Sequence, residues 1–271
     1  MKKTVIWTAF AAILLLFAAC ETEKPFEPLF NGENLDNWEL FVGSPLRGFD
    51  SLALAATPEK LFSVTGDGDE KVIRISGEVN GSMATCASYA DYHLKLIFRW
   101  GDSVYTSRNS GLLYHSFGDF GAAFGTWMTN IECQLMHGNL GDTYLMNNTV
   151  CETAALKDDS TGSFVFTPGA DPLPFGAKAN GNSVKKSADH EKPLGEWNTV
   201  ELYSLGQTTV HVVNGVTVMV NTLTGTAGED GSVTPLTGGK IQIQSEGGEL
   251  FVKSVEIRPI TNIPAGILSQ K

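Results

Sequence analysis

Apolar and polar residues alternate with a period of two along much of the chain, and this pattern constrains the fold more than any other feature. In the segment 92–100 the even-numbered positions are all apolar or aromatic, whereas the odd-numbered positions include His93, Lys95 and Arg99. Successive side chains of a strand point to opposite faces, so the pattern predicts a strand with one dry face. Further strands are predicted at 72–76, 112–115, 130–136, 199–203, 240–244 and 250–258.

The dipeptide Asn214-Gly215 separates two β-rich runs, 210–213 and 216–220. Asn and Gly accept the positive φ angles that the two central residues of a type I′ turn require. We therefore predict a two-residue β-hairpin here.

Helical periodicity is not sustained anywhere after the N-terminal segment, so we expect few and short helices. Many short strands together with 29 glycines indicate a β-sandwich or jelly roll, in which one sheet packs on another. The segment 148–193 interrupts the alternation and is rich in Gly, Pro, Asn, Asp and Lys; a connection of that length is typically functional or disordered. The sequences on either side have too few strands to close a sandwich alone, so residues 29–271 are interpreted as one domain.

The N-terminus has the pattern of a secretory signal, with Lys2 and Lys3, an apolar run at 5–17 and then Ala-Ala before Cys20. This placement resembles the lipobox of bacterial lipoproteins, in which the cysteine is acylated by fatty acids such as palmitate. We expect residues 1–19 to be removed and residues 20–28, which are acidic and contain two prolines, to form a lipidated tether. The protein would then lie in the cell envelope, lipid-anchored at the outer membrane or the periplasmic face. The alternative is an ordinary cleaved signal with an incidental cysteine.

The charge of the chain argues against nucleic-acid binding, and its cysteine content argues against a structural zinc site. The chain has 19 basic and 30 acidic residues, and its formal charge of −11 becomes −13 when Lys2 and Lys3 leave with the signal. Nucleic-acid binding is therefore not expected, because phosphates require clustered cations. The other cysteines, Cys86, Cys133 and Cys151, allow at most one disulfide and leave one thiol free. Their spacing does not match a structural zinc site.

Two predicted strands present polar side chains on one face. In 130–136 that face holds Glu132 and Gln134, and in 241–246 it holds Gln242, Gln244 and Glu246. If both strands lie in one sheet, carboxylates and amides line a common surface that suits the hydroxyl groups of a sugar. The alternative interpretation is that both faces are the solvent-exposed sides of an outer sheet.

Other candidate residues lie near these strands. Asn109 precedes a predicted strand that ends in Tyr114 and His115, both of which are able to stack on or hydrogen-bond to a sugar ring. His137 and Asp142 follow the Glu132 strand, in a loop of the kind that displays functional groups. Taken singly, His115 is also typical of a surface histidine and Asp142 of a turn.

Several segments, in this order, resemble the bacterial family of 3-keto-disaccharide hydrolases, which was formerly a domain of unknown function. They are 29–38, 109–115, 131–134, 141–142, 195–200, 214–215 and 241–247. The resemblance implies a concanavalin A-like jelly-roll β-sandwich, secreted or lipid-anchored, that cleaves glycosides oxidised at carbon 3. The chain departs from the family pattern in the 148–193 insertion and in Cys133, where valine is expected.

The implied chemistry is an elimination followed by a hydration, because a 3-keto group acidifies the hydrogen at carbon 2. From residue chemistry we assign Glu132 as the base or acid and His115 as its partner. The residues expected to position the sugar are Asn109, Tyr114, Gln134, His137, Asp142 and Glu246. No cofactor is expected, although a divalent metal stays open because His115, Glu132, His137 and Asp142 are all metal-ligating types.

The sequence is also compatible with two other functions. One is a non-catalytic carbohydrate-binding lipoprotein on the same fold, since fold alone does not determine activity. The other is a conventional glycosidase, which needs a second carboxylate near Glu132, with Glu246 as the candidate. A structural or adhesive role ranks last.

Overall fold

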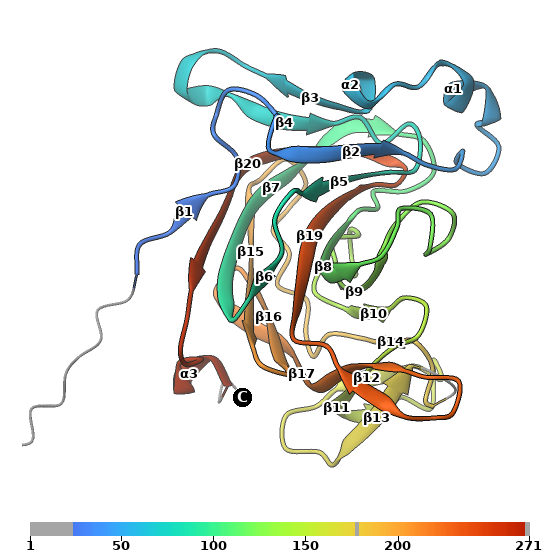
Figure 1. Ribbon diagram of the computed structural model, residues 1–271, viewed down its shortest axis with the longest axis vertical. Helices are drawn as coiled ribbons and strands as arrows, with labels where there is room; N and C mark the ends of the chain where they lie inside the picture. The colour runs from blue at the N-terminus through green and yellow to red at the C-terminus, as the bar shows by residue number, and fades with distance from the viewer. Residues whose placement is uncertain (1–23, 177–178, 269–271) are drawn as a thin grey trace, which may run out of the picture.

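Two antiparallel sheets pack face to face in the computed structural model, which describes residues 24–176 and 179–268 (Figure 1). Helices in this part of the chain are short: α1 (Asp50–Ala55), α2 (Pro58–Leu61), α3 (Ala265–Leu268) and one 3₁₀ turn, Gly68–Glu70. The prediction of an all-β jelly-roll sandwich with few short helices is confirmed.

The larger sheet has twelve strands among the described residues. Its main path is β12 (Phe164–Phe166), β11 (Thr149–Lys157), β17 (Val216–Ala227), β16 (Thr208–Val213), β15 (Asn198–Leu205), β7 (Tyr92–Val104), β20 (Gly248–Pro259), β4 (Val72–Ile75) and β3 (Phe62–Thr65). Beside this path, β1 (Glu27–Pro28) pairs with β20, β13 (Pro172–Gly176) with β11, and β18 (Val233–Pro235) with β17. The predicted hairpin joins β16 to β17, with φ of +49° at Asn214 and +85° at Gly215.

The smaller sheet has eight strands in the described part of the chain. Its path is β14 (Ser183–Val184), β10 (Thr143–Leu145), β9 (Thr129–Gln134), β8 (Gly111–Phe117), β19 (Gly238–Ser245), β5 (Gly81–Thr85) and β2 (Trp38–Val42), and β6 (Tyr89–Ala90) pairs with β19. The two strands predicted to share a polar face, β9 and β19, both pair with β8, so they belong to one sheet.

The hydrophobic core lies between the two sheets. Leu94 and Leu96 of β7 enter it from one side, and Ile131, Cys133 and Ile243 enter it from β9 and β19. Since these inward positions alternate with Glu132, Gln134, Gln242 and Gln244, the polar side chains lie on the outer face of the smaller sheet.

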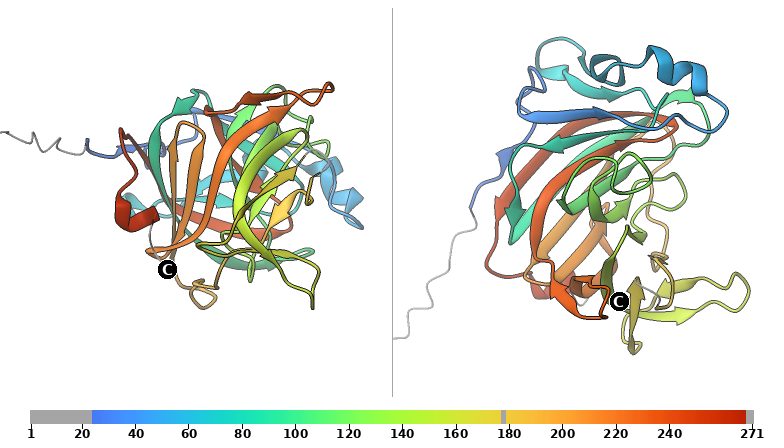
Figure 2. Two further views of the ribbon diagram at one scale, coloured as in Figure 1. Left: turned by 90° about the horizontal axis from the view of Figure 1, so that it is seen from below. Right: turned by 45° about the vertical axis from the view of Figure 1, so that its right-hand side comes forward.

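The segment 148–193 contains four strands, β11 to β14, rather than the structureless connection that its composition suggests. In β11 the buried positions alternate, but all four are small or polar: Thr149, Cys151, Thr153 and Ala155. A pattern based on large apolar residues does not detect such a strand. The segment pairs with β17 in the larger sheet and with β10 in the smaller one, and it lies at one end of the sandwich (Figure 2).

The structure describes only part of the N-terminal segment for which predictions were made. Cys20 and the signal sequence lie outside the described residues. The end of the expected tether contacts the sandwich: the Phe26 ring lies 5.0 Å from the His93 ring, and the Arg258 guanidinium lies 4.6 Å over the Phe26 ring. No helix among the described residues is long and apolar enough to cross a membrane. Cys86, Cys133 and Cys151 are free thiols, and the last two are buried.

Candidate active site

A cavity of about 380 Å³ opens on the outer face of the smaller sheet, a size in the range typical of small-molecule sites. It is formed by β9 and β10 and by the loops at the ends of β8 and β19. Asn80, just before β5, and Asn182, just before β14, complete it. Its lining residues are Asn80, Asn109, Phe124, Trp127, Glu132, Gln134, Met136, Tyr144, Leu145, Met146, Asn182 and Glu246. Asn182 comes from the 148–193 insertion, which therefore contributes to one wall.

Glu132 lies at the centre of this cavity wall. It is on β9, between Leu113 of β8 and Tyr144 of β10, and its side chain is only 2% exposed. Gly111 leaves the room that it occupies, because a Cβ at that position would overlap both Glu132 Oε1 and Gln244 Oε1. The glycine thus allows the Glu132 carboxylate and the Gln244 amide to approach each other over β8.

Several polar atoms at this cavity are buried without a hydrogen-bond partner among the described residues. Those that line it are Glu132 Oε1, Asn109 Oδ1 and Asn80 Oδ1, and both polar atoms of the Gln244 amide, which lies beside Glu132 over Gly111, are unpaired as well. An unsatisfied buried polar group costs about 1–3 kcal/mol, so folded proteins retain few of them. Their concentration at one cavity indicates a site prepared for a polar ligand.

The two carboxyl groups of the cavity have raised pKa values. Burial raises the pKa of Glu132 well above 4.5, and the negative charges of Glu246 and Asp142 raise it further. Burial raises the pKa of Glu246 to about 7. Both carboxyl groups are therefore weaker acids than an ordinary glutamate, which is the property that lets a carboxyl group act as a general acid or base nearer to neutral pH.

Apolar side chains form the rest of the cavity wall. Leu113, Ala123, Trp127 and Met146 make a small cluster of their own, separate from the main core, on the outer face of the smaller sheet. The indole nitrogen of Trp127 donates to the Gly81 carbonyl at 3.0 Å, which holds the ring in place. The cavity thus combines a carboxylate and amide side with an aromatic side.

Four of the eight residues predicted from the sequence line this cavity: Asn109, Glu132, Gln134 and Glu246. Glu132, Gln134, Gln242 and Gln244 are buried, so the alternative of a plainly solvent-exposed outer face does not describe this sheet. The sequence pattern did not identify four further lining residues, Phe124, Trp127, Tyr144 and Asn182, or the role of Gly111. It also left Gln244 unassigned, although Gln244 shares a strand face with Glu246.

Tyr114 and His115 lie in the interior of the sandwich instead. The pairing of β8 with β9 shifts between Tyr114 and Phe117, and His115 has a positive φ of +51°. Such a bulge breaks the alternation, so both side chains face the opposite sheet. His115 Nε2 lies 2.9 Å from Ser204 Oγ, and burial lowers the pKa of the imidazole to about 4. The structure does not bring His115 to Glu132.

His137 and Asp142 are also outside the cavity lining. His137 is half-exposed, and its Nδ1 lies 3.0 Å from the Glu191 carboxylate. The buried Asp142 carboxylate accepts hydrogen bonds from Lys185 Nζ at 2.9 Å and from the Lys186 backbone N–H at 2.8 Å, which attaches the end of the insertion beside β10. Asp142 therefore stabilises the cavity wall. Within the described residues no three His, Cys, Asp or Glu side chains gather as metal ligands.

Replacing Tyr114 by phenylalanine tests its placement in the interior. The phenol oxygen lies 3.0 Å from Thr209 Oγ1 and 3.1 Å from His211 Nε2, so its loss leaves buried partners unpaired. We expect the free energy of unfolding to fall by about 1–3 kcal/mol in urea denaturation. The KM of the folded variant should stay within about twofold of the parent value, since lost side-chain hydrogen bonds act locally. A raised KM at unchanged stability would place Tyr114 in the candidate site after all.

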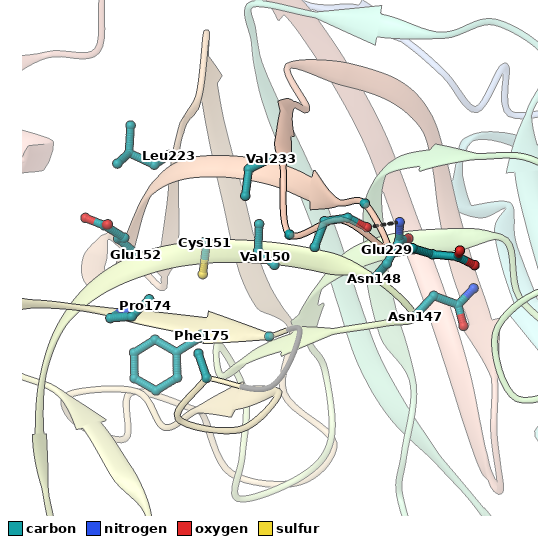
Figure 3. Close-up of a pocket in the computed structure, with 15 residues that line it drawn as sticks. Asn147, Asn148, Val150, Cys151, Glu152, Pro174, Phe175, Leu223, Glu229 and Val233 are labelled. Carbon is teal, nitrogen blue, oxygen red and sulfur yellow. Dashed lines mark hydrogen bonds between the residues drawn. The ribbon is translucent and has the colours of Figure 1, made fainter.

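A larger hollow of about 650 Å³ lies where β11 and β13 meet β17 and β18 (Figure 3). Its lining is mostly apolar and includes Val150, Pro174, Phe175 and Val233. None of the buried unpaired polar side-chain atoms in the described residues belongs to it. Burial raises the pKa of its one thiol, Cys151, to about 12, so that thiol is not a nucleophile at neutral pH. The chemistry is concentrated in the Glu132 cavity.

The fold and this cavity place the protein in the class of concanavalin A-like jelly-roll sandwiches that have a ligand-sized hollow on the outer face of one sheet. The chain belongs to the family of 3-keto-alpha-glucoside-1,2-lyase-like domains, whose family model matches residues 25–258. That range contains every cavity residue named above.

Solved structures show the same fold at low sequence identity. A candidate glycosyl hydrolase from Parabacteroides distasonis ATCC 8503 is 20% identical, with a TM-score of 0.50 over 88% of this chain and 100% of that chain. A second candidate glycosyl hydrolase from the same organism is 20% identical, with a TM-score of 0.51 over 87% of this chain and 94% of that one. No protein of the curated set matches the chain.

Proposed function

We propose that this protein cleaves the glycosidic bond of 3-keto glycosides by elimination followed by hydration. The observation that carries the proposal is the Glu132–Glu246 pair, two carboxyl groups with raised pKa values beside unpaired amides in one cavity. The family match supports the substrate class, because the family description names a 3-keto-alpha-glucoside 1,2-lyase.

In the first step ionised Glu246 removes the proton at carbon 2, and the C–H electron pair moves toward the carbon-3 carbonyl to form an enolate. The enolate then collapses, the bond from carbon 1 to the glycosidic oxygen breaks, and protonated Glu132 gives its proton to that oxygen. The products are an alcohol and a 3-keto sugar with a double bond between carbons 1 and 2. General acid and base groups typically contribute about 10²–10⁴-fold each to such proton transfers.

In the second step water adds across the double bond. Glu132, now ionised, takes a proton from water as the water oxygen attacks carbon 1. Glu246, whose proton has exchanged with solvent as the alcohol leaves and water enters, gives a proton to carbon 2. Glu132 is then protonated and Glu246 ionised, as at the start, so the cycle is balanced. The amide of Gln244, whose nitrogen is buried without a partner among the described residues, supplies a donor for the enolate oxygen.

The distinguishing experiment incubates purified protein with a 3-keto disaccharide and with its unoxidised parent, and follows the released sugar. The proposal predicts cleavage of the oxidised substrate only, because without the ketone the hydrogen at carbon 2 is not acidic. Cleavage of the parent at an equal or greater rate would instead favour a conventional glycosidase that uses the same two carboxyl groups.

A carbohydrate-binding protein without turnover is the second candidate. It is favoured by the amide and aromatic lining of the cavity, which recognises a sugar without any chemistry. Binding of both disaccharides with release from neither would select it.

We also propose that the protein works in the cell envelope, attached through acylated Cys20. The basic, apolar and small-residue order of the first twenty residues supports this location. Labelled fatty acid that is incorporated by the parent chain and lost in Cys20→Ala is the expected result, and equal labelling of both chains would contradict it.

A further inference from the structure

The loop 118–128, which joins β8 to β9, is attached to the sheet at several points. Phe120 stacks on Phe41 of β2 with ring centroids 4.8 Å apart, and Thr126 Oγ1 accepts a hydrogen bond from the Ser44 backbone N–H at 3.1 Å. Trp127 is 3% exposed and pairs by a β-bridge with Ala123. The loop is therefore a well-anchored element beside the cavity.

Phe124 projects from this anchored loop, and its side chain is 71% exposed even though it lines the cavity. Its ring meets the Trp127 ring edge-on at a centroid distance of 6.3 Å. Leaving a phenylalanine so exposed forgoes most of the free energy that its burial would contribute. Because Phe124 lines the cavity, a ligand bound there would cover the exposed ring.

The backbone at Phe124 is also held in the left-handed region, with φ of +50°. A bulky L-residue there is strained, whereas glycine adopts this conformation readily. Glycine precedes and follows at Gly121 and Gly125, both with positive φ, so the loop already uses glycine where only the backbone turn matters. Strain retained at a ligand-lining residue points to a role for its side chain.

We propose that Phe124 is the platform on which the sugar ring of the substrate stacks, and that it determines the affinity of the cavity for a pyranose. The inference rests on the proposed function to the extent that the cavity takes a sugar. The C–H groups on one side of a pyranose form an apolar face that packs on an aromatic ring. The hydroxyl groups of the sugar would then contact the carboxylate and amide side of the cavity. Phe124 is thus a substrate-binding residue that does not transfer protons.

The test compares Phe124→Ala, Phe124→Gly and Phe124→Tyr in a background that carries both Glu132→Gln and Glu246→Gln and so lacks the two proposed proton-transfer groups. Binding of a 3-keto disaccharide is measured by titration calorimetry. We expect Ala and Gly to weaken binding about tenfold, and Tyr, which keeps the ring, to stay within about twofold. In otherwise unchanged enzyme Phe124→Ala should raise KM about tenfold with kcat within about threefold, because uniform binding is lost.

Leu223 provides a matched control. It is 53% exposed, has φ of +50° and lines the other hollow. Leu223→Gly should leave sugar binding unchanged, and both glycine variants should keep or raise the melting temperature because each relieves a strained backbone. A Phe124→Gly protein that melts lower than the parent and binds sugar equally well would make Phe124 a structural residue and overturn the proposal.

Failure of the platform and failure of the proposed function give different results. Equal sugar binding by the parent, Phe124→Ala and Phe124→Gly overturns the platform, whatever Glu132→Gln does to turnover. Weakened binding in those variants together with full turnover by Glu132→Gln supports the platform and overturns the proposed proton transfers.

Discussion

Glu132→Gln is expected to lower kcat by about 10²–10⁴-fold while the protein remains folded. Glutamine keeps the shape of the side chain over Gly111 but has no proton to give to the leaving oxygen. The measurement is release of sugar from a 3-keto disaccharide, with Glu33→Gln as the control because Glu33 is an exposed carboxylate far along the chain. Unchanged turnover would mean that the Glu132 carboxyl group has no part in the reaction.

The same substitution should make the protein more stable at neutral pH. The pKa of Glu132 is higher in the folded protein than its ordinary value of 4.5, so above that pH the folded state binds more protons than the unfolded state. Stability therefore decreases as pH rises from 4.5 toward the folded-state pKa, and glutamine removes that loss. Urea denaturation should show a gain of about 1–3 kcal/mol at pH 8 and a smaller one at pH 5. A gain that is equal at both pH values would not come from ionisation of this group.

Glu246→Gln is expected to lower kcat by about 10²–10⁴-fold and to change the shape of the pH profile. In the parent protein kcat/KM should rise as pH increases through about 7, where Glu246 ionises and becomes a base. It should decrease again at higher pH, when Glu132 loses its proton. The residual activity of the variant should lack the low-pH limb.

The high-pH limb of that variant should also move to lower pH. The negative charge of Glu246 helps to raise the pKa of Glu132, so its removal lowers the Glu132 pKa. Glu196→Gln, at an exposed position, should reproduce the parent profile. A low-pH limb that persists unchanged in Glu246→Gln would assign the base to another group.

The β-sandwich and half of the candidate site follow from local sequence pattern. Alternation in β9 and β19 places Glu132, Gln134, Gln244 and Glu246 on the face away from the core, and pairing of both strands with β8 makes that face continuous. The sequence also predicts the hairpin at Asn214 because one dipeptide has the required conformation. Short-range pattern suffices where each strand is regular.

The rest of the candidate site could not be predicted from the sequence, because its residues lie where the alternation of strand residues is interrupted or absent. The bulge after Tyr114 turns His115 inward, and the sequence does not indicate it, since histidine is found in regular strands as well as at positive φ. Phe124 and Trp127 belong to an irregular loop with no period to interpret. Asn182 reaches the cavity only because β14 pairs with β10, a contact between segments about forty residues apart that depends on the buried Asp142.

The fate of the hydrogen at carbon 2 tests the proposed reaction most directly. A 3-keto disaccharide is cleaved in D₂O and the released keto sugar is analysed for deuterium at carbon 2, with spontaneous exchange measured by incubating the product in D₂O without protein and subtracted. Elimination and hydration predict one solvent deuterium at carbon 2 in the product beyond that background. Product that retains its original hydrogen at carbon 2 would contradict the account, because direct displacement at carbon 1 leaves that bond intact.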